Sequence, residues 1–365
     1  MSGGSAGRDM IATGLPMRVI SSLVLVAALS AFVSAQSTPS ANTTLTAVPG
    51  IKVGHHTLTE RPTGCTVIVV DGDGAVGGVA QRGGAPGTRE TDLLDPSNMV
   101  DKVNAVVLAG GSAFGLDAAS GTVKWLEEHN IGWDVRIAKV PIVPAAILFD
   151  LPVGGNPRIR PTAECGYRAA AAASLAPVAE GTIGAGAGAT VGKTGGPGRS
   201  MKAGLGSYSI TLPNGLSVGA IVAVNAVGDI IDPDTGKIVA GVRNPDGTFA
   251  DARTLLRTGR TGPRPRAGEN TTIGLVATNA RLTKAQAQRM ALMADDGYAR
   301  AIYPSHTVGD GDTVFALATG QWSGDADVTQ IGALAADVMA RAIVRAATQA
   351  TGLPDLPAAR DLKKR

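Results

Sequence analysis

The segment Asn270-Thr271-Thr272-Ile273-Gly274-Leu275-Val276-Ala277-Thr278 decides how the chain is interpreted. Its apolar and β-branched residues predict a buried strand over residues 272–278. The preceding residues, 243–270, are rich in proline, glycine and arginine. A polar loop of this length is uncommon inside a compact domain unless it is functional or disordered. We therefore expect a mobile loop to run directly into a rigid strand at Asn270–Thr271.

A threonine at such a junction has the chemistry of an internal nucleophile. The hydroxyl of Thr271 can attack the carbonyl carbon of Asn270 and form an ester by an N-to-O acyl shift, which water then splits. The freed threonine amine, with an ordinary pKa of about 7.7–8.0, can act as base for its own hydroxyl. The prediction is self-cleavage between Asn270 and Thr271, followed by amide hydrolysis at Thr271. The alternative is an ordinary loop-to-strand junction.

Four further polar residues are candidates for the same site. Asp310 and Asp312 flank Gly311, and paired carboxylates can divide their roles so that one moves protons while the other stays charged. The same pattern also suits a turn or a cation site. Lys193 is a candidate cation for developing negative charge, or a solvated loop lysine. Asn225 is a candidate oxyanion donor, or a turn-forming residue at the end of a strand.

The remaining pattern predicts an α/β protein. Apolar, β-branched runs predict strands, capping residues before amphipathic runs predict helices, and glycine-rich or polar runs predict loops. The expected strands are 66–70, 103–108, 216–226 and 314–318; the expected helices are 112–129, 160–176, 283–301 and 327–351; the expected loop and polar tail are 181–198 and 353–365.

Residues 1–35 have the organisation of a secretory signal peptide. Arg18 precedes a short apolar run, which ends at the small-x-small pattern Val33-Ser34-Ala35. A single membrane anchor is the alternative, although the run is short for a bilayer span. Residues 36–46 are rich in serine and threonine and are expected to be a linker. This pattern predicts a periplasmic or secreted protein.

Composition narrows the range of partners. Without residues 1–35 the net charge is +2, which argues against nucleic acid or an acidic membrane as the partner of the mature protein. The cysteines are Cys65 and Cys165; a disulfide is one possibility, but their apolar surroundings favour buried thiols. No Cys/His spacing suggests zinc, and neither a metal nor a cofactor is expected.

Several separated motifs resemble the L-aminopeptidase/D-esterase (β-aminopeptidase) family of self-cleaving N-terminal-nucleophile hydrolases. The resemblance runs from residue 47 to about 345. The motifs that carry it are Arg89-Glu90-Thr91-Asp92-Leu93-Leu94, Gly110-Gly111-Ser112-Ala113-Phe114-Gly115-Leu116-Asp117, Val224-Asn225-Ala226-Val227-Gly228-Asp229, Asn270-Thr271-Thr272-Ile273 and Val276-Ala277-Thr278-Asn279-Ala280.

The chain departs from the aminopeptidases of this family at the nucleophile and at the acidic segment. They carry a serine and a serine-glycine-acid segment, whereas this chain has Thr271 and Asp310-Gly311-Asp312. Both choices resemble the nylon oligomer (6-aminohexanoate-oligomer) endohydrolase branch, in which a threonine is supported by two aspartates, a lysine and an asparagine. The matching positions are Thr271, Asp310, Asp312, Lys193 and Asn225.

The resemblance also implies a fold, an assembly and a substrate class. The fold is a four-layer αββα sandwich of one larger fragment, 47–270, and one smaller fragment, 271–365. The cleaved protomers are expected to form a homo-oligomer. The substrates left open are small peptides, simple amides and ω-amino-acid oligomers.

Two other classes of function compete with this interpretation. Residues 187–194 nearly fit a phosphate-cradling loop, but Gly195, Gly196 and Pro197 interrupt any following helix. A nucleotide-binding titration distinguishes that class. A non-catalytic binding protein on the same scaffold predicts an uncut chain, which one denaturing gel reveals.

Overall fold

The larger structural unit of the chain begins at Asn42. The computed structural model describes residue 1, residues 42–263 and residues 269–362, and residues 42–365 make up one unit. The expected linker, 36–46, is therefore too long at its C-terminal end. The apolar side chain of Leu45 is fully buried in the core between the sheets, and the Leu45 amide donates to Ser207 Oγ at 2.8 Å. The predicted signal peptide, 1–35, lies outside the described residues.

A five-stranded sheet forms one inner layer. Its β2 pairs antiparallel with both β1 and β6, and β6 pairs parallel with β9. All seven residues of β2 are buried, so both faces of this strand are covered. In spatial order the strands are β1 (Ile51–Thr57), β2 (Gly64–Val70), β6 (Ala105–Ala109), β9 (Ala145–Ile147) and β4 (Thr88–Arg89).

A six-stranded sheet forms the second inner layer and carries the predicted nucleophile. Its strand β16 lies between β13, to which it is antiparallel, and β18, to which it is parallel. All of β16 is buried, as expected for the run over 272–278. In spatial order the strands are β12 (Leu205–Thr211), β13 (Ser217–Asn225), β16 (Thr271–Thr278), β18 (Thr313–Ala318), β3 (Ala75–Gln81) and β5 (Lys102–Val103).

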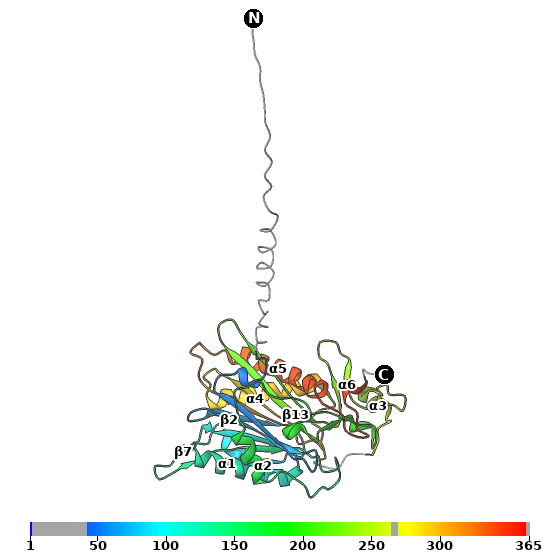
Figure 1. The fold of residues 1–365 in the computed structure, drawn as a ribbon, viewed down its shortest axis with the longest axis horizontal. Coiled ribbons are helices and arrows are strands. Elements are labelled where there is room, and N and C mark those ends of the chain that lie inside the picture. Colours follow the sequence, from blue (N-terminus) through cyan, green and yellow to red (C-terminus); the bar gives the residue numbers. More distant parts are fainter. Residues whose placement is uncertain (2–41, 264–268, 363–365) are drawn as a thin grey trace. The chain divides into compact units, whose positions relative to one another are not determined.

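Helices cover the outer face of each sheet (Figure 1). Helices α1 (Ala118–Glu128) and α2 (Ala163–Ala171) pack on the five-stranded sheet, and α4 (Lys284–Ala301) and α5 (Val328–Thr348) pack on the six-stranded sheet. Three apolar clusters fill the spaces between the four layers: one between α4, α5 and their sheet, one between the sheets, and one beneath α1 and α2. The expected αββα sandwich is confirmed.

The caps of the two long helices follow the sequence closely. Thr283 and Gln286 form a reciprocal capping box at the start of α4. Asp327 caps α5 by accepting from the Thr329 amide at 2.8 Å. Ser112, in contrast, does not cap α1. A 3₁₀ turn, η3 (Ser112–Asp117), comes first, and its Gly115 packs so closely on the Gly110 carbonyl that a Cβ would lie 1.9 Å from the oxygen.

Two segments expected to be irregular contain helices. The stretch 243–270 includes α3 (Ala252–Thr258), which Asp251 caps; residues 264–268 of that stretch lie outside the described part. The expected polar tail includes α6 (Ala359–Leu362), where Ala358 and Ala359 are buried. Small apolar side chains in both segments pack against the domain, and that packing outweighs their polar composition.

The other elements are short and join the layers. In the described ranges no helix is long and apolar enough to cross a membrane. The short strands are β7 (Trp133–Asp134), β8 (Lys139–Val140), β10 (Thr190–Val191), β11 (Met201–Lys202), β14 (Asp229–Ile231), β15 (Ile238–Ala240) and β17 (Ile302–Tyr303), and the 3₁₀ turns are η1 (Leu45–Ala47), η2 (Asp92–Leu94), η4 (Gly184–Gly186) and η5 (Lys193–Gly195).

The two cysteines form a disulfide, which corrects the expectation of buried thiols. Cys65 lies in β2 and Cys165 in α2, with their Cα atoms 6.2 Å apart. Apolar surroundings do not distinguish a thiol from a disulfide. The pairing depends on how α2 packs over β1 and β2, which sequence spacing does not reveal.

Candidate active site

Thr271 is the first residue of β16 and is 1% exposed. It lies opposite Asn225 in the register of β13 and β16. Its hydroxyl donates to the carbonyl oxygen of Asn270, with 2.5 Å between the oxygens. The nucleophile candidate is thus held against the carbonyl group that self-cleavage requires it to attack.

The backbone of Gly311 faces the same carbonyl group. Asn270 and Asp310 form a parallel bridge, and the Gly311 amide donates to the Asn270 carbonyl oxygen at 2.9 Å. A donor in this position stabilises negative charge on the oxygen during attack on the carbon. The sequence gives no sign of this role, because a backbone donor leaves no residue-type signal.

Asp310 and Asp312 both lie beside the junction, in the segment that leads into a strand. They precede β18, which begins at Thr313. Asp310 Oδ2 accepts from the Thr307 amide at 2.8 Å, whereas its Oδ1 is buried without a hydrogen-bond partner in the described part of the chain. Burial, reinforced by the charge of Asp312, raises the pKa of Asp310 to about 6. Asp312 Oδ1 accepts from the Thr272 amide at 2.8 Å.

Lys193 and Asn225 are in direct contact. Lys193 Nζ lies 2.8 Å from Asn225 Oδ1 and 3.2 Å from the Asn225 carbonyl oxygen. The lysine side chain is partly exposed, yet loss of hydration lowers its pKa to about 7. The negative charges of Asp310, Glu269 and Asp150 act to raise the pKa but do not outweigh this effect. Near neutral pH, Lys193 and Asp310 therefore both lie close to their titration points, which suits proton transfer.

Asn225 is anchored on both sides of its amide group. Its Nδ2 donates to the Phe149 carbonyl at 3.0 Å, and its Oδ1 also accepts from the amide of Thr190 at 3.1 Å. The amide proposed as an oxyanion donor is thus committed to Phe149 in the uncut chain. The donors that contact the Asn270 oxygen are Gly311 and the Thr271 hydroxyl.

A pocket of about 780 Å³ opens beside Lys193 and Asn270. Its wall is largely apolar, and part of it comes from residues 353–356, which the sequence interpretation assigned to a polar tail. The lining residues are Pro62, Phe149, Pro152, Val153, Gly154, Thr190, Lys193, Gly196, Pro197, Gly198, Ser200, Pro263, Glu269, Asn270, Leu353, Pro354, Asp355 and Leu356.

His306 is a second residue that the sequence interpretation missed. Its amide donates to Asp312 Oδ2 at 3.0 Å, and its Nδ1 lies 3.0 Å from the same oxygen. The available signal was its position, four residues before Asp310, in a chain with four histidines. A histidine so near a carboxylate pair is a candidate for tuning their charge.

The phosphate-loop alternative lacks its structural context. Residues 187–194 pass from η4 through β10 into the 3₁₀ turn η5, so a strand does not lead into the loop and an α-helix does not follow it.

The part of the chain that the structure describes holds no group of three His, Cys, Asp or Glu side chains arranged to bind a metal ion.

Comparisons with known proteins agree on one family for this chain. The model of peptidase family S58 matches residues 43–356. An uncharacterized aminopeptidase of Mycobacterium bovis is 43% identical over 345 residues, covering 87% of this chain and 97% of that protein. A 6-aminohexanoate-oligomer endohydrolase of Kocuria sp. is 31% identical over 318 residues, covering 82% and 84%.

The fold agrees with a solved structure. The L-aminopeptidase D-Ala-esterase/amidase of Ochrobactrum anthropi, described as a variant of the Ntn hydrolase fold, superposes with a TM-score of 0.64 at 19% identity. The alignment covers 88% of this chain and 92% of that protein. The chain therefore belongs to peptidase family S58 and is an amide hydrolase.

Proposed function

We propose that this hydrolase cleaves its own Asn270–Thr271 bond and then uses Thr271 as an N-terminal nucleophile. The observation that carries the proposal is the pair of donors on the Asn270 carbonyl oxygen: the Thr271 hydroxyl at 2.5 Å and the Gly311 amide at 2.9 Å. An ordinary loop-to-strand junction does not need a buried hydroxyl and a backbone amide on one carbonyl group.

Self-cleavage begins with attack of Thr271 Oγ1 on the carbonyl carbon of Asn270. The hydroxyl proton passes to the threonine nitrogen, the C–N bond breaks, and an ester remains between Asn270 and Thr271. Gly311 donates to the oxygen on which negative charge develops. Water then splits the ester, leaving a carboxylate on Asn270 and a free amine and hydroxyl on Thr271.

Turnover repeats this chemistry on an external amide. The Thr271 amine accepts the hydroxyl proton, the substrate carbonyl carbon forms an ester with Thr271 Oγ1, and the amine product leaves with a proton. Water hydrolyses the ester and restores the enzyme. We assign Asp310 the role of orienting the amine, with Asp312 beside it and Lys193 balancing the two carboxylates from the wall of the pocket.

Small peptides, simple amides and ω-amino-acid oligomers are the proposed substrates. The Mycobacterium bovis relative is named as an aminopeptidase and the Kocuria relative as an oligomer endohydrolase. An apolar pocket wall suits an aliphatic or apolar acyl chain. Lys193 and Glu269 lie on that wall, where they can meet the polar ends of such a chain.

Substitution of Thr271 tests the proposal. Thr271→Ala removes the hydroxyl and is expected to block both self-cleavage and turnover on a panel of peptides and amides. Thr271→Ser keeps a hydroxyl and is expected to retain part of each. Thr272→Ser, in the next position of the same strand, is the control and is expected to process normally. Hydrolysis by Thr271→Ala at the parent rate contradicts the assignment.

We also propose that the mature protein begins near Gln36 and acts outside the cytoplasm. The basic-apolar-small pattern at 17–35 supports export, and a Cys65–Cys165 disulfide suits an oxidising compartment. Fractionation of the native cell, with N-terminal sequencing, tests this. Uncleaved chain in the cytoplasmic fraction contradicts it.

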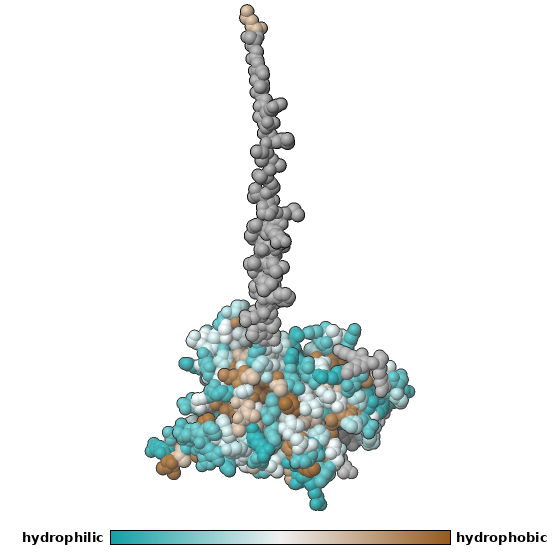
Figure 2. Space-filling view, in the orientation of Figure 1, coloured by the Kyte–Doolittle hydropathy of each residue, from teal (hydrophilic) through white to brown (hydrophobic). Residues whose placement is uncertain are grey.

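Assembly into a homo-oligomer without a membrane partner is the remaining proposal. An apolar patch at the tip of the β7–β8 hairpin supports it (Figure 2), where Ile137 is 95% exposed and Val135 and Val140 are also exposed. Sedimentation of the purified protein measures the state. A monomer at micromolar concentration contradicts the proposal.

A further inference from the structure

A line of charged side chains connects the nucleophile strand with the surface. His306 Nδ1 lies 3.0 Å from Asp312 Oδ2, and His306 Nε2 lies 3.5 Å from Asp295 Oδ2. Arg82 continues the line, with its Nε 3.3 Å from the same oxygen of Asp295. The imidazole therefore bridges two carboxylates, one beside the nucleophile and one on helix α4.

Asp312 connects His306 with the nucleophile strand β16. One oxygen of Asp312 faces His306, and the other accepts from the Thr272 amide at 2.8 Å. Thr272 follows the nucleophile directly. A shift of the Asp312 carboxylate therefore moves the start of β16, and displacements near 1 Å can cost about 10²-fold in rate.

The imidazole is held firmly between its partners. The side chains of Asp295 and Asp312 are 0% and 3% exposed, and that of His306 is 18% exposed. The Tyr298 ring stacks on the imidazole with 5.8 Å between centroids. The backbone of His306 has φ 55°, a left-handed conformation that a residue with a Cβ rarely adopts unless the surrounding contacts hold it there.

The surroundings favour the charged form of His306. Burial and the charge of Arg82 act to lower its pKa, but the close carboxylate of Asp312 and the negative charge of Asp295 outweigh them, so the pKa is raised. Burial raises the pKa of Asp295 to about 7, although the charges of His306 and Arg82 act to lower it. The charged and titratable groups that face the imidazole are thus Asp312, then Asp295 and Tyr298 of α4, and Arg82 after β3.

We propose that His306 is a positioning residue: by bridging Asp295 and Asp312, it holds the Asp312 carboxylate on the Thr272 amide and so fixes the reactive end of β16. This inference rests on the proposed function of Thr271. Loss of the imidazolium removes a cation from beside the carboxylates, which makes their ionised forms less favourable.

Substitution of His306 by glutamine tests the kinetic consequence. His306→Gln is expected to move the acid limb of the pH–kcat/KM profile to higher pH and to lower kcat roughly 10–100-fold, while KM stays within about twofold of the parent value. His129→Gln is the matched control, because His129 is exposed and stacks on Trp125 far from this line; its profile is expected to match the parent. A parent-like acid limb in His306→Gln overturns the proposal.

An NMR titration of the imidazole resonances tests the charge state without any use of activity. His306, assigned as the signal lost in His306→Gln, is expected to titrate above the ordinary value of about 6.5 in the parent and lower in Asp295→Asn. If His306→Gln does not fold, mutation of the other histidines assigns the signal by elimination. Titration at or below about 6.5 in the parent overturns the proposal. Failure of the proposed function appears instead as no cleavage or turnover in the parent, whatever His306 does.

Discussion

Gly311 lies so close to the nucleophile that it has no room for a side chain. A Cβ at this position would lie 2.7 Å from the Ala85 carbonyl oxygen and 2.9 Å from Thr271 Oγ1. Neither neighbour is the end of a flexible side chain, so an alanine must displace the 310–312 segment. Its amide would then leave the Asn270 carbonyl oxygen.

Gly311→Ala is therefore expected to slow self-cleavage. Loss of one oxyanion donor typically costs roughly 10²–10³-fold in rate. The measurement is the rate of cleavage of precursor refolded from denaturant, followed on denaturing gels. Thermal unfolding of the same variant controls for loss of fold. Cleavage at the parent rate in a folded variant shows that the Gly311 amide does not act on the carbonyl group.

The pKa values of Asp310 and Lys193 set the pH range of self-cleavage. Asp310 loses its charge as the pH falls through about 6, and Lys193 loses its charge as the pH rises through about 7. Both charges are present together between these values, so cleavage of refolded precursor is expected to be fastest there. Asp310→Asn should remove the acid limb and Lys193→Met the alkaline limb. A rate that is flat from pH 5 to about 9 argues against both roles.

At the residue scale, the sequence was enough to predict which side chains gather at the Asn270–Thr271 junction, but not which atoms they contact. Thr271, Asp310, Asp312, Lys193 and Asn225 do lie around one junction, and their residue types suggested why. Nothing in residue type shows that Asn225 donates to the Phe149 carbonyl. That contact depends on how β13 and the residue 149 loop are placed, so it follows only from tertiary structure.

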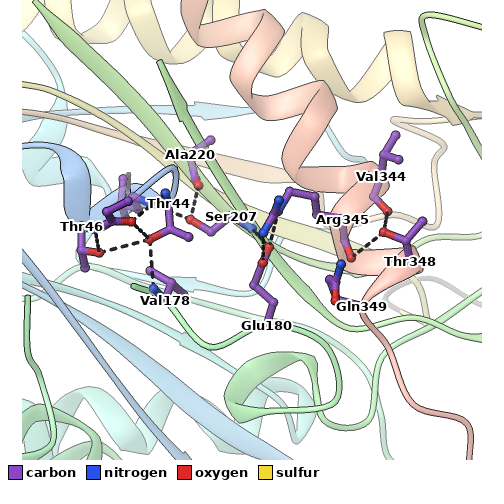
Figure 3. A network of polar contacts seen from close by, with 12 residues as sticks. Thr44, Thr46, Val178, Glu180, Ser207, Ala220, Val344, Arg345, Thr348 and Gln349 are labelled. Atoms are coloured by element: carbon purple, nitrogen blue, oxygen red, sulfur yellow. Dashed lines mark hydrogen bonds and ion pairs between the residues drawn. The ribbon is translucent and has the colours of Figure 1, made fainter. Parts of the chain in front are cut away.

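At the element scale, one polar network links the two fragments that self-cleavage would produce (Figure 3). Glu180 belongs to the larger fragment and Arg345, on α5, to the smaller. Arg345 Nε donates to Glu180 Oε1 at 2.8 Å, its Nη2 donates to Oε2, and the Ser207 amide donates to Oε1 at 2.8 Å. Ser207 Oγ in turn accepts from the Leu45 amide.

Arg345→Met is expected to lower the free energy of unfolding by about 1–3 kcal/mol, because it leaves the largely buried Glu180 carboxylate without its cation. The matched control is Arg168→Met, which breaks the exposed Arg168–Glu164 pair at the cost of a few tenths of a kcal/mol. Chemical denaturation of the processed protein measures both. Equal losses in the two variants indicate that the Glu180 network does not stabilise the fragments.

Strands and long helices could be predicted because their signals are local. The buried run of β16, the Thr283 capping box and the Asp327 cap each lie within one short segment. The 3₁₀ turn η3 and helix α3 could not be predicted in the same way. Gly115 of η3 packs closely on the backbone of Gly110, and Ala252 and Leu255 of α3 are buried in the domain, so both elements involve tertiary contacts.

At the scale of the whole molecule, the order of strands depends on long-range pairing. The αββα architecture came from family resemblance, not from periodicity, since β16 pairs with β18 and β18 with the distant β3. The Cys65–Cys165 disulfide and the packing of residues 42–46 also depend on contacts between distant segments, so the sequence alone does not reveal them. Strands β16 and β18 are central in their sheet and belong to the smaller fragment, so cleavage at Asn270–Thr271 is expected to leave one folded body.

The mass of the purified protein under denaturing conditions tests the central claim most directly. Intact-mass spectrometry, with N-terminal sequencing of each species, reports whether and where the chain is cut. The account predicts two polypeptides, of which the smaller begins with Thr271, and a single uncut polypeptide from Thr271→Ala. An active parent protein whose chain remains continuous through Asn270 and Thr271 contradicts it.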